Sequence, residues 1–230
     1  MHDDTKEQVG MSRRRFLVVS GGAALALLLR HGLAAASEGQ AVQEFLETTC
    51  GQGQPAAPRV LIAYASRCGS TGGLAMAMAG ELCGLGAAVD VRLVENVKDI
   101  SPYQAVMVGS AIRRGRWLSE ATAFVKTHQA TLSRLPLAYF VACLTMREDT
   151  PENRAKVLAY LEPLRKAAPG LNPLAVGLFA GALDFGKLSF MDKTVMEARG
   201  AAEGDYRDLP AVKAWAAGQA PGLLARQGRG

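Results

Sequence analysis

Residues 59–73 read Arg-Val-Leu-Ile-Ala-Tyr-Ala-Ser-Arg-Cys-Gly-Ser-Thr-Gly-Gly, and this stretch decides the fold. The apolar run 60–65 predicts a buried strand. A polar turn at 66–71 ends it, and a helical pattern over 74–82 follows at once. Because the first amides of a helix lack intrahelical acceptors and carry partial positive charge, this junction predicts an anion site.

The turn has the side chains that a phosphate group needs. Ser66, Ser70 and Thr71 offer hydroxyls, and Gly69 lets the backbone approach closely. Neither a P-loop lysine nor a dinucleotide G-x-G-x-x-G pattern is present. A phosphatase loop would need arginine at position 74, which is leucine. The turn therefore predicts a cradle that holds a phosphate monoester without cleaving it; the alternative is an ordinary, well-capped βα turn.

Strand and helix patterns alternate along the rest of the chain. Further strands are predicted at 88–93, 105–109, 137–144 and 174–179, and further helices at 117–132, 151–167, 188–199 and 209–217. Five strands joined by crossover helices predict an α/β doubly wound domain, a parallel sheet with helices on both faces.

Ligands of such sheets bind beyond the carboxyl ends of the strands. Besides the cradle, the exits at 110–117 and 143–149 are informative. The first holds three arginines and Trp117, which suits a flat ring system with carboxylates or phosphates. The alternative is a solvated basic loop in which Trp117 only packs against the next helix.

The N-terminal residues show the motifs of a targeting segment in the expected order. Ser12-Arg-Arg-Arg-Phe-Leu17 resembles the twin-arginine signal pattern; an apolar run at 16–29 and the alanines 34–36 follow. We therefore expect a signal segment at 1–36 and partnership with the twin-arginine export machinery. The protein is then exported and periplasmic, or membrane-associated if the segment stays uncleaved. A short buried helix is the remaining alternative.

Composition places the other boundaries. We expect a linker at 37–58, a domain at 59–218 and a flexible tail at 219–230. Residues 1–36 hold five Lys and Arg against three Asp and Glu, which leaves 21 basic and 18 acidic side chains for the rest of the chain. That mild balance predicts no nucleic-acid partner. No metal-ligand spacing is present, and no catalytic side chain is singled out.

The four cysteines leave their pairing open. Cys50, Cys68, Cys83 and Cys143 can pair in three ways, and no pair suggests itself from the sequence. Because Cys68 lies at a predicted helix N-terminus, one expectation is that the pKa of its thiol is lowered. The alternative is a small residue that fills a turn.

These motifs resemble a known family. Tyr64-Ala-Ser-Arg-Cys-Gly-Ser-Thr71 is similar to the FMN-phosphate loop of flavodoxin-type domains, and Val108-Gly-Ser-Ala-Ile-Arg-Arg-Gly-Arg-Trp117 is similar to their second flavin loop. The resemblance is closest to the group of menaquinone-dependent protoporphyrinogen dehydrogenases, and extends over about 59–218. It implies a flavodoxin-like sheet of strand order 2-1-3-4-5 and FMN as the cofactor.

Carried over by position, the resemblance implies a set of FMN-binding residues. The FMN phosphate would be held by Ser66, Arg67, Cys68, Gly69, Ser70 and Thr71. The ring would be lined by Ser110, Ala111, Ile112, Arg113, Arg114 and Gly115, with Trp117 at its border. The other edge of the ring would be contacted by Cys143, Leu144 and Thr145. Two positions depart from the pattern. Cys68 replaces a tyrosine or hydroxyl residue, and Arg114 replaces an aromatic residue.

Three functions are consistent with these features. The first is an FMN-dependent oxidoreductase that resembles the protoporphyrinogen/quinone dehydrogenases, with electrons passing through flavin N5 and a quinone or small acidic substrate as partner. The second is an exported flavodoxin-type electron-transfer protein with a redox protein partner. The third is a flavodoxin fold that has lost flavin binding.

Overall fold

A computed structural model describes residues 45–53, 56–198 and 200–225. The predicted signal segment at 1–36 lies outside the described residues. One seven-stranded sheet has the order β1-β3-β2-β4-β6-β7, with β5 paired to β4. Its strands are β1 (Thr48–Cys50), β2 (Arg59–Ala65), β3 (Ala88–Leu93), β4 (Ala105–Arg113), β5 (Arg116–Trp117), β6 (Leu137–Ala142) and β7 (Ala175–Phe179).

The five predicted strands are β2, β3, β4, β6 and β7, and all four of their pairings are parallel. Numbered among themselves in chain order, they lie 2-1-3-4-5, so the predicted fold class and strand order are confirmed. β2 lies inside the sheet, between β3 and β4, and six of its seven residues are therefore buried. The chain passes from β2 to β3 on one side of β2 and then crosses to β4 on the other side, so the winding reverses at β2.

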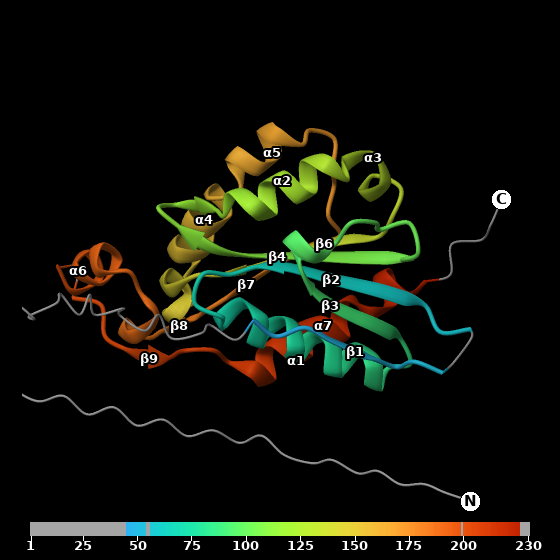
Figure 1. Ribbon diagram of the computed structural model, residues 1–230, viewed down its shortest axis with the longest axis horizontal. Coiled ribbons are helices and arrows are strands. Elements are labelled where there is room, and N and C mark those ends of the chain that lie inside the picture. Colours follow the sequence, from blue (N-terminus) through green and yellow to red (C-terminus); the bar gives the residue numbers. More distant parts are fainter. Residues whose placement is uncertain (1–44, 54–55, 199, 226–230) are drawn as a thin grey trace, which may run out of the picture. The chain divides into compact units, whose positions relative to one another are not determined.

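Helices cover both faces of the sheet. Figure 1 shows α2 to α5 on one face and α1 with α7 on the other. Each face has its own apolar core, one including Phe124 and Tyr139, the other including Tyr64 and Phe140. The helices are α1 (Ser70–Gly84), α2 (Ser119–Thr127), α3 (Gln129–Leu132), α4 (Pro151–Ala159), α5 (Glu162–Ala167), α6 (Phe190–Ala198) and α7 (Leu209–Leu224).

Short elements complete the described chain. Three 3₁₀ turns are η1 (Val94–Asn96), η2 (Leu144–Arg147) and η3 (Phe185–Lys187). β8 (Ala182–Leu183) and β9 (Gly204–Asp205) form a separate two-stranded antiparallel sheet. The helices expected at 117–132 and 151–167 are each divided in two, near His128 and Tyr160. The first also begins later than expected, at Ser119, because Trp117 belongs to β5.

The sheet includes a strand within the predicted linker 37–58. β1 pairs antiparallel with β3, so residues 48–50 belong to the fold. A disulfide joins Cys50 to Cys83 near the end of α1, a pairing that the sequence left open. Three residues make a weak strand signal by themselves, and the partner β3 and the cross-link hold them in the sheet.

The last helix extends past the expected domain end at Gly218. α7 runs to Leu224, through Pro221, in the stretch expected to begin a flexible tail. Ala220 and Leu223 are buried in the core beneath α1. Burial of these side chains outweighs the local helix-breaking preference of proline. Residues 226–230 of the predicted tail lie outside the described part.

Candidate functional site

The carboxyl ends of the parallel strands surround a pocket of about 780 Å³. This volume lies within the range of small-molecule sites. The lining residues come from the exits of β2, β4, β6 and β7, from α6 and from the segment before β1. They are Phe45, Ser66, Arg67, Cys68, Ser70, Ala111, Ile112, Arg113, Leu118, Ala142, Leu144, Gly181, Ala182, Leu183, Gly186, Lys187, Leu188, Ser189, Asp192 and Met196.

The predicted phosphate cradle is a tight turn before α1. Gly69 has a φ of 82°, a left-handed conformation that favours glycine. Its amide donates to Ser66 Oγ at 3.0 Å, and its carbonyl accepts from the Gly72 amide at 3.0 Å. The Ser70 and Thr71 amides at the start of α1 have no backbone acceptor among the described residues. The turn therefore presents free helix N-terminal donors beside the pocket.

Thr71 has an unusual environment within this turn. Its side chain is fully buried, and its Oγ1 has no hydrogen-bond partner among the described residues. Buried hydroxyls are nearly always paired, because leaving one unpaired costs about 1–3 kcal/mol. Thr71 is not among the residues that line the pocket, but its neighbour Ser70 is, so the unpaired hydroxyl lies next to a lining residue.

Arg67 and Cys68 project from the same turn but are engaged elsewhere. The Arg67 guanidinium forms an ion pair with Glu120 at the start of α2. Cys68 Sγ donates to the carbonyl oxygen of Lys187 at 3.4 Å. Burial, together with the charge of Asp192, raises the pKa of the Cys68 thiol. The lowered pKa considered from the sequence is therefore wrong.

The predicted second loop, 110–117, is largely a β-hairpin. β4 continues to Arg113, and β5 returns at Arg116, with Arg113 opposite Arg116. The two turn residues, Arg114 and Gly115, have φ values of 52° and 72°, as in a two-residue hairpin turn. Ala111, Ile112 and Arg113 line the pocket, whereas the two turn residues do not.

Trp117 lies in the core and does not line the pocket. It is 3% exposed, and its ring meets Tyr139 edge-on at 5.2 Å between centroids. The expectation that Trp117 borders a bound ring is not supported by this placement. Trp117 packs in the core as the alternative held, but its aromatic partner Tyr139 belongs to β6 and not to the next helix. Burial of a large aromatic surface beneath α5 accounts for the position.

Ser110 and the third loop have mainly structural roles in the described chain. Ser110 is fully buried and accepts from the Leu118 amide at 3.0 Å while donating to the Ala111 carbonyl at 2.8 Å. In the third loop Leu144 lines the pocket. Cys143 and Thr145, its neighbours, are not among the lining residues, and the Cys143 amide is bonded to the Phe179 carbonyl at 2.9 Å.

The largest group of pocket residues that sequence reasoning missed follows β7. Gly181 to Leu183, Gly186 to Ser189, and Asp192 and Met196 of α6 form this wall. Asp192 accepts from Arg113 Nη2 at 2.6 and 2.8 Å, and these hydrogen bonds hold its pKa below its ordinary value. The same rule that selected the other strand exits applies to β7 and would have found Gly181.

Within 45–53, 56–198 and 200–225, no group of three or more His, Cys, Asp or Glu is placed to hold a metal ion. Over the same ranges, no helix combines the length and apolar character that membrane crossing requires.

The chain is similar to two curated relatives, both called protoporphyrinogen IX dehydrogenase [quinone]. The *Leishmania major* protein is 30% identical over 109 residues, 45% of this chain and 46% of that protein. The *Escherichia coli* K12 protein is 28% identical over 144 residues, 60% of this chain and 77% of that protein. The chain thus matches less than half the length of the first and about three quarters of the second.

Solved structures include flavodoxins. One from the domain Archaea is 16% identical, with a TM-score of 0.45, and the match covers 72% of this chain and 98% of that one. Flavodoxin 2 from Bacillus cereus is 20% identical, with a TM-score of 0.42, and the match covers 69% of this chain and 94% of that one.

The profile of the flavodoxin domain matches residues 61–209, from β2 to the start of α7. That span contains the cradle, the hairpin and the β7 exit, and it covers more than half of the chain. The parallel sheet of order 2-1-3-4-5 is in keeping with the match. This chain is a member of the flavodoxin domain family.

Proposed function

We propose that the protein is an FMN-dependent oxidoreductase that passes electrons from a small reduced substrate to a quinone. The observation that carries the proposal is the buried, unpartnered Thr71 hydroxyl in a turn of free helix N-terminal amides. A phosphate monoester supplies the acceptors that these donors lack. The reaction named for both curated relatives supports the choice of a quinone as acceptor.

The residues around the pocket fit a flavin mononucleotide. Ser70, Thr71 and the amides at the start of α1 would hold the phosphate, and Gly181 leaves room there, since a Cβ would lie 3.3 Å from Ser70 Oγ. Ala111, Ile112 and Leu144 provide an apolar wall for a flat ring and exclude water from it. When bound, FMN would supply the transfer of two electrons and two protons from the reduced substrate to a quinone that leaves as quinol, with the electrons passing through N5.

The charges of the site support a substrate that is small and only modestly acidic. Arg113 is paired with Asp192, and Arg67 with Glu120, so both arginines of the rim are largely neutralised. Lys187, a further basic residue of the lining, is itself 3.5 Å from the Asp184 carboxylate. A protoporphyrinogen, as in the relatives, is the first substrate to test, followed by other reduced acidic compounds.

Titration of the purified protein with FMN and with riboflavin tests the cradle. We expect FMN to bind at least tenfold more tightly, because only FMN brings the phosphate acceptor to Thr71. Thr71→Val should reduce this preference by about ten- to a hundredfold, on the basis of about 1.5–3 kcal/mol for a hydrogen bond to a charged group, whereas Thr71→Ser should retain it.

A matched control is Thr122→Val on α2, because the Thr122 hydroxyl donates to the Leu118 carbonyl and Thr122 is not itself among the residues that line the pocket. It should leave both affinities unchanged. Equal binding of FMN and riboflavin by the native protein would contradict the phosphate cradle. Steady turnover of a reduced substrate with a soluble quinone and no protein partner separates this proposal from an electron-transfer shuttle.

We also propose that the protein is exported by the twin-arginine pathway. The signal-like segment at 1–36 is the basis, and the Cys50–Cys83 disulfide supports an oxidising compartment. Replacing Arg13 and Arg14 by Lys should leave the protein in the cytoplasmic fraction. N-terminal sequencing of the exported form then decides between cleavage near Ala36 and retention as an anchor; unchanged distribution of the double variant would contradict the proposal.

A further inference from the structure

Phe45 brings an aromatic side chain to the pocket from outside the family match. It lies before β1, whereas the flavodoxin profile begins at residue 61. Among the described residues that line the pocket, Phe45 is the one aromatic residue. Trp117, the aromatic that the sequence placed at the ring, is buried against Tyr139. The apolar wall thus gains an aromatic group from a segment that was expected to be a linker.

A hydrogen bond to the end of β2 fixes the residue next to Phe45. The Leu46 carbonyl accepts from the Tyr64 hydroxyl at 2.8 Å. Tyr64 is fully buried near the end of β2, and a Cβ at Gly72 in the first turn of α1 would lie 2.9 Å from its hydroxyl. Burial, assisted by the charge of Glu47, raises the pKa of Tyr64 to about 12, so this donor keeps its proton.

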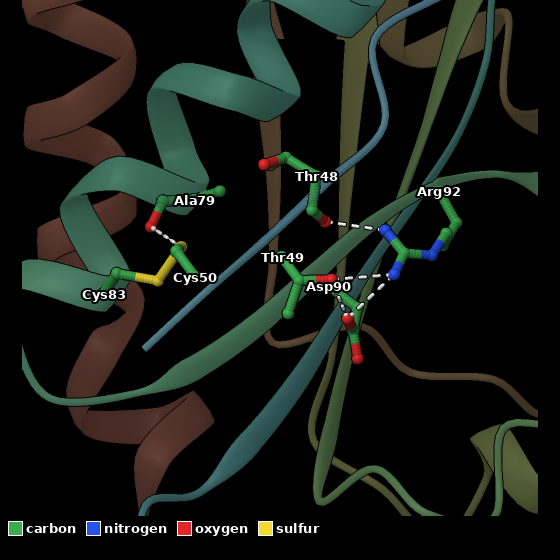
Figure 2. Close-up of a disulfide and its surroundings, with 7 residues drawn as sticks. All are labelled: Thr48, Thr49, Cys50, Ala79, Cys83, Asp90 and Arg92. Atoms are coloured by element: carbon green, nitrogen blue, oxygen red, sulfur yellow. Dashed lines mark hydrogen bonds and ion pairs between the residues drawn. A yellow bond between two sulfur atoms is a disulfide. The ribbon is translucent and has the colours of Figure 1, made fainter. Parts of the chain in front are cut away.

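The next residues are held to the edge of the sheet. The Glu47 carboxylate accepts from the Leu93 amide at 2.8 Å and from Asn96 Nδ2 at 2.9 Å. Figure 2 shows Arg92 reaching the Thr48 carbonyl and the Thr49 hydroxyl, each at 2.7 Å. These contacts continue the β1–β3 pairing toward the pocket.

The disulfide closes the arrangement covalently. It ties Cys50 of β1 to Cys83 near the carboxyl end of α1, and the other end of the same helix forms the cradle. The segment 46–50 is therefore attached at Tyr64, at β3 and at α1. A segment with so many attachments cannot move away from the pocket without breaking several of them.

We propose that Phe45 is a positioning residue that packs against the flavin ring and that the disulfide-linked strand β1 holds it there. The inference rests on the proposed function, because it requires FMN in the pocket. The geometry is suited to this role: a planar apolar group lies in the wall of a pocket that otherwise has aliphatic and polar walls. Stacking of aromatic rings on planar heterocycles adds affinity without any need for specific hydrogen bonds.

The test compares FMN binding by Phe45→Ala and Leu46→Ala. Leu46 is the neighbour, its side chain is 39% exposed, and it is not among the lining residues, so it is the matched control. We expect about a tenfold weaker FMN affinity for Phe45→Ala and less than a twofold change for Leu46→Ala. Because the proposal places Phe45 against the ring, which FMN and riboflavin share, riboflavin affinity should fall by the same factor.

A double-mutant cycle tests the role of the disulfide. Cys50→Ser with Cys83→Ser should weaken FMN binding several-fold, and adding Phe45→Ala should then cost much less than tenfold. If the loss of the disulfide and Phe45→Ala instead weaken FMN binding by independent factors that multiply, the claim that β1 holds Phe45 in place is overturned. All titrations are run well below the melting temperature of each variant, which thermal unfolding provides.

A spectroscopic measurement keeps the inference testable if the cysteine variants fold poorly. Phe45→Trp should quench the fluorescence of bound FMN more strongly than Leu46→Trp does, because quenching by electron transfer from tryptophan falls off steeply with distance from the ring. Failure of the native protein to bind FMN would refute the proposed function. Tight binding that is indifferent to Phe45→Ala, with no quenching by Phe45→Trp, would refute this inference alone.

Discussion

Removing the disulfide should cost the protein a large part of its stability. The bond closes a loop with a sequence separation of 33 residues between Cys50 and Cys83. The chain-entropy relation assigns such a loop of 33 residues about 12 cal/mol/K, or about 3.7 kcal/mol at 298 K. Cys50→Ser combined with Cys83→Ser should therefore lower the free energy of unfolding by about 3–4 kcal/mol.

The assay is guanidinium unfolding of the double variant and of the oxidised native protein, each followed by circular dichroism. For a domain of this size the same loss corresponds to a decrease of about 7–15 °C in the melting temperature. Cys68→Ser is the control, because Cys68 is a free thiol, and it should change stability by less than the disulfide does.

Thiol counting under denaturing conditions checks the premise directly. Cys68 and Cys143 are the free cysteines, so two thiols should react before reduction and four after it. A stability loss below about 1 kcal/mol, with two thiols counted beforehand, would refute the entropic reasoning. It would show that the unfolded chain is already compact around this loop.

Three further predictions concern the cradle, the pocket wall and the sheet edge. Gly69→Ala should destabilise the fold by about 1–2 kcal/mol and weaken FMN binding, because a φ of 82° is unfavourable for a residue with a Cβ; unchanged melting and affinity would contradict the left-handed turn. Asp192→Asn should lower the pKa of Cys68, since the Asp192 charge is among the causes that raise it; the pH profile of iodoacetamide labelling should shift to lower pH, and an unshifted profile would contradict this. For Asp90, burial alone would raise the carboxyl pKa, but hydrogen bonds from Thr49 and Tyr103 and the Arg92 charge outweigh burial and lower it. The carboxylate therefore stabilises the fold above its unfolded pKa of about 4, and this contribution is lost as pH falls through the lower folded value; Asp90→Asn should flatten the melting temperature between pH 5 and 3, and parallel curves would contradict the assignment.

The central fold could be predicted because its signals are local. The apolar run of β2, the turn after it and the start of α1 are contiguous, so their physical chemistry is readable without knowledge of distant contacts. The same holds for the alternation of strands and helices that predicts a parallel sheet. The left-handed turn at Gly69 also follows from residue type, since few other residues adopt that conformation without strain.

Contacts between distant segments could not be read in this way. The sequence gives no reason for Cys50 to pair with Cys83 until β1 is placed against β3, beside the end of α1. Trp117 suits a ligand ring or a core equally well by composition, and only the packing of β5 against Tyr139 decides between them. Asp192 reaches Arg113 across a sequence separation of 79 residues.

The sequence by itself therefore determined the class of fold and the polar turn between β2 and α1. Strand periodicity, helix starts and turn residues are signals that involve only a few neighbouring positions. The tertiary structure decided which side chains complete the pocket. Phe45, Gly181 and Asp192 reach it only after strand order, hairpin and disulfide bring separate segments to one edge of the sheet. Such convergence depends on long-range packing, to which no local pattern of residues is sensitive.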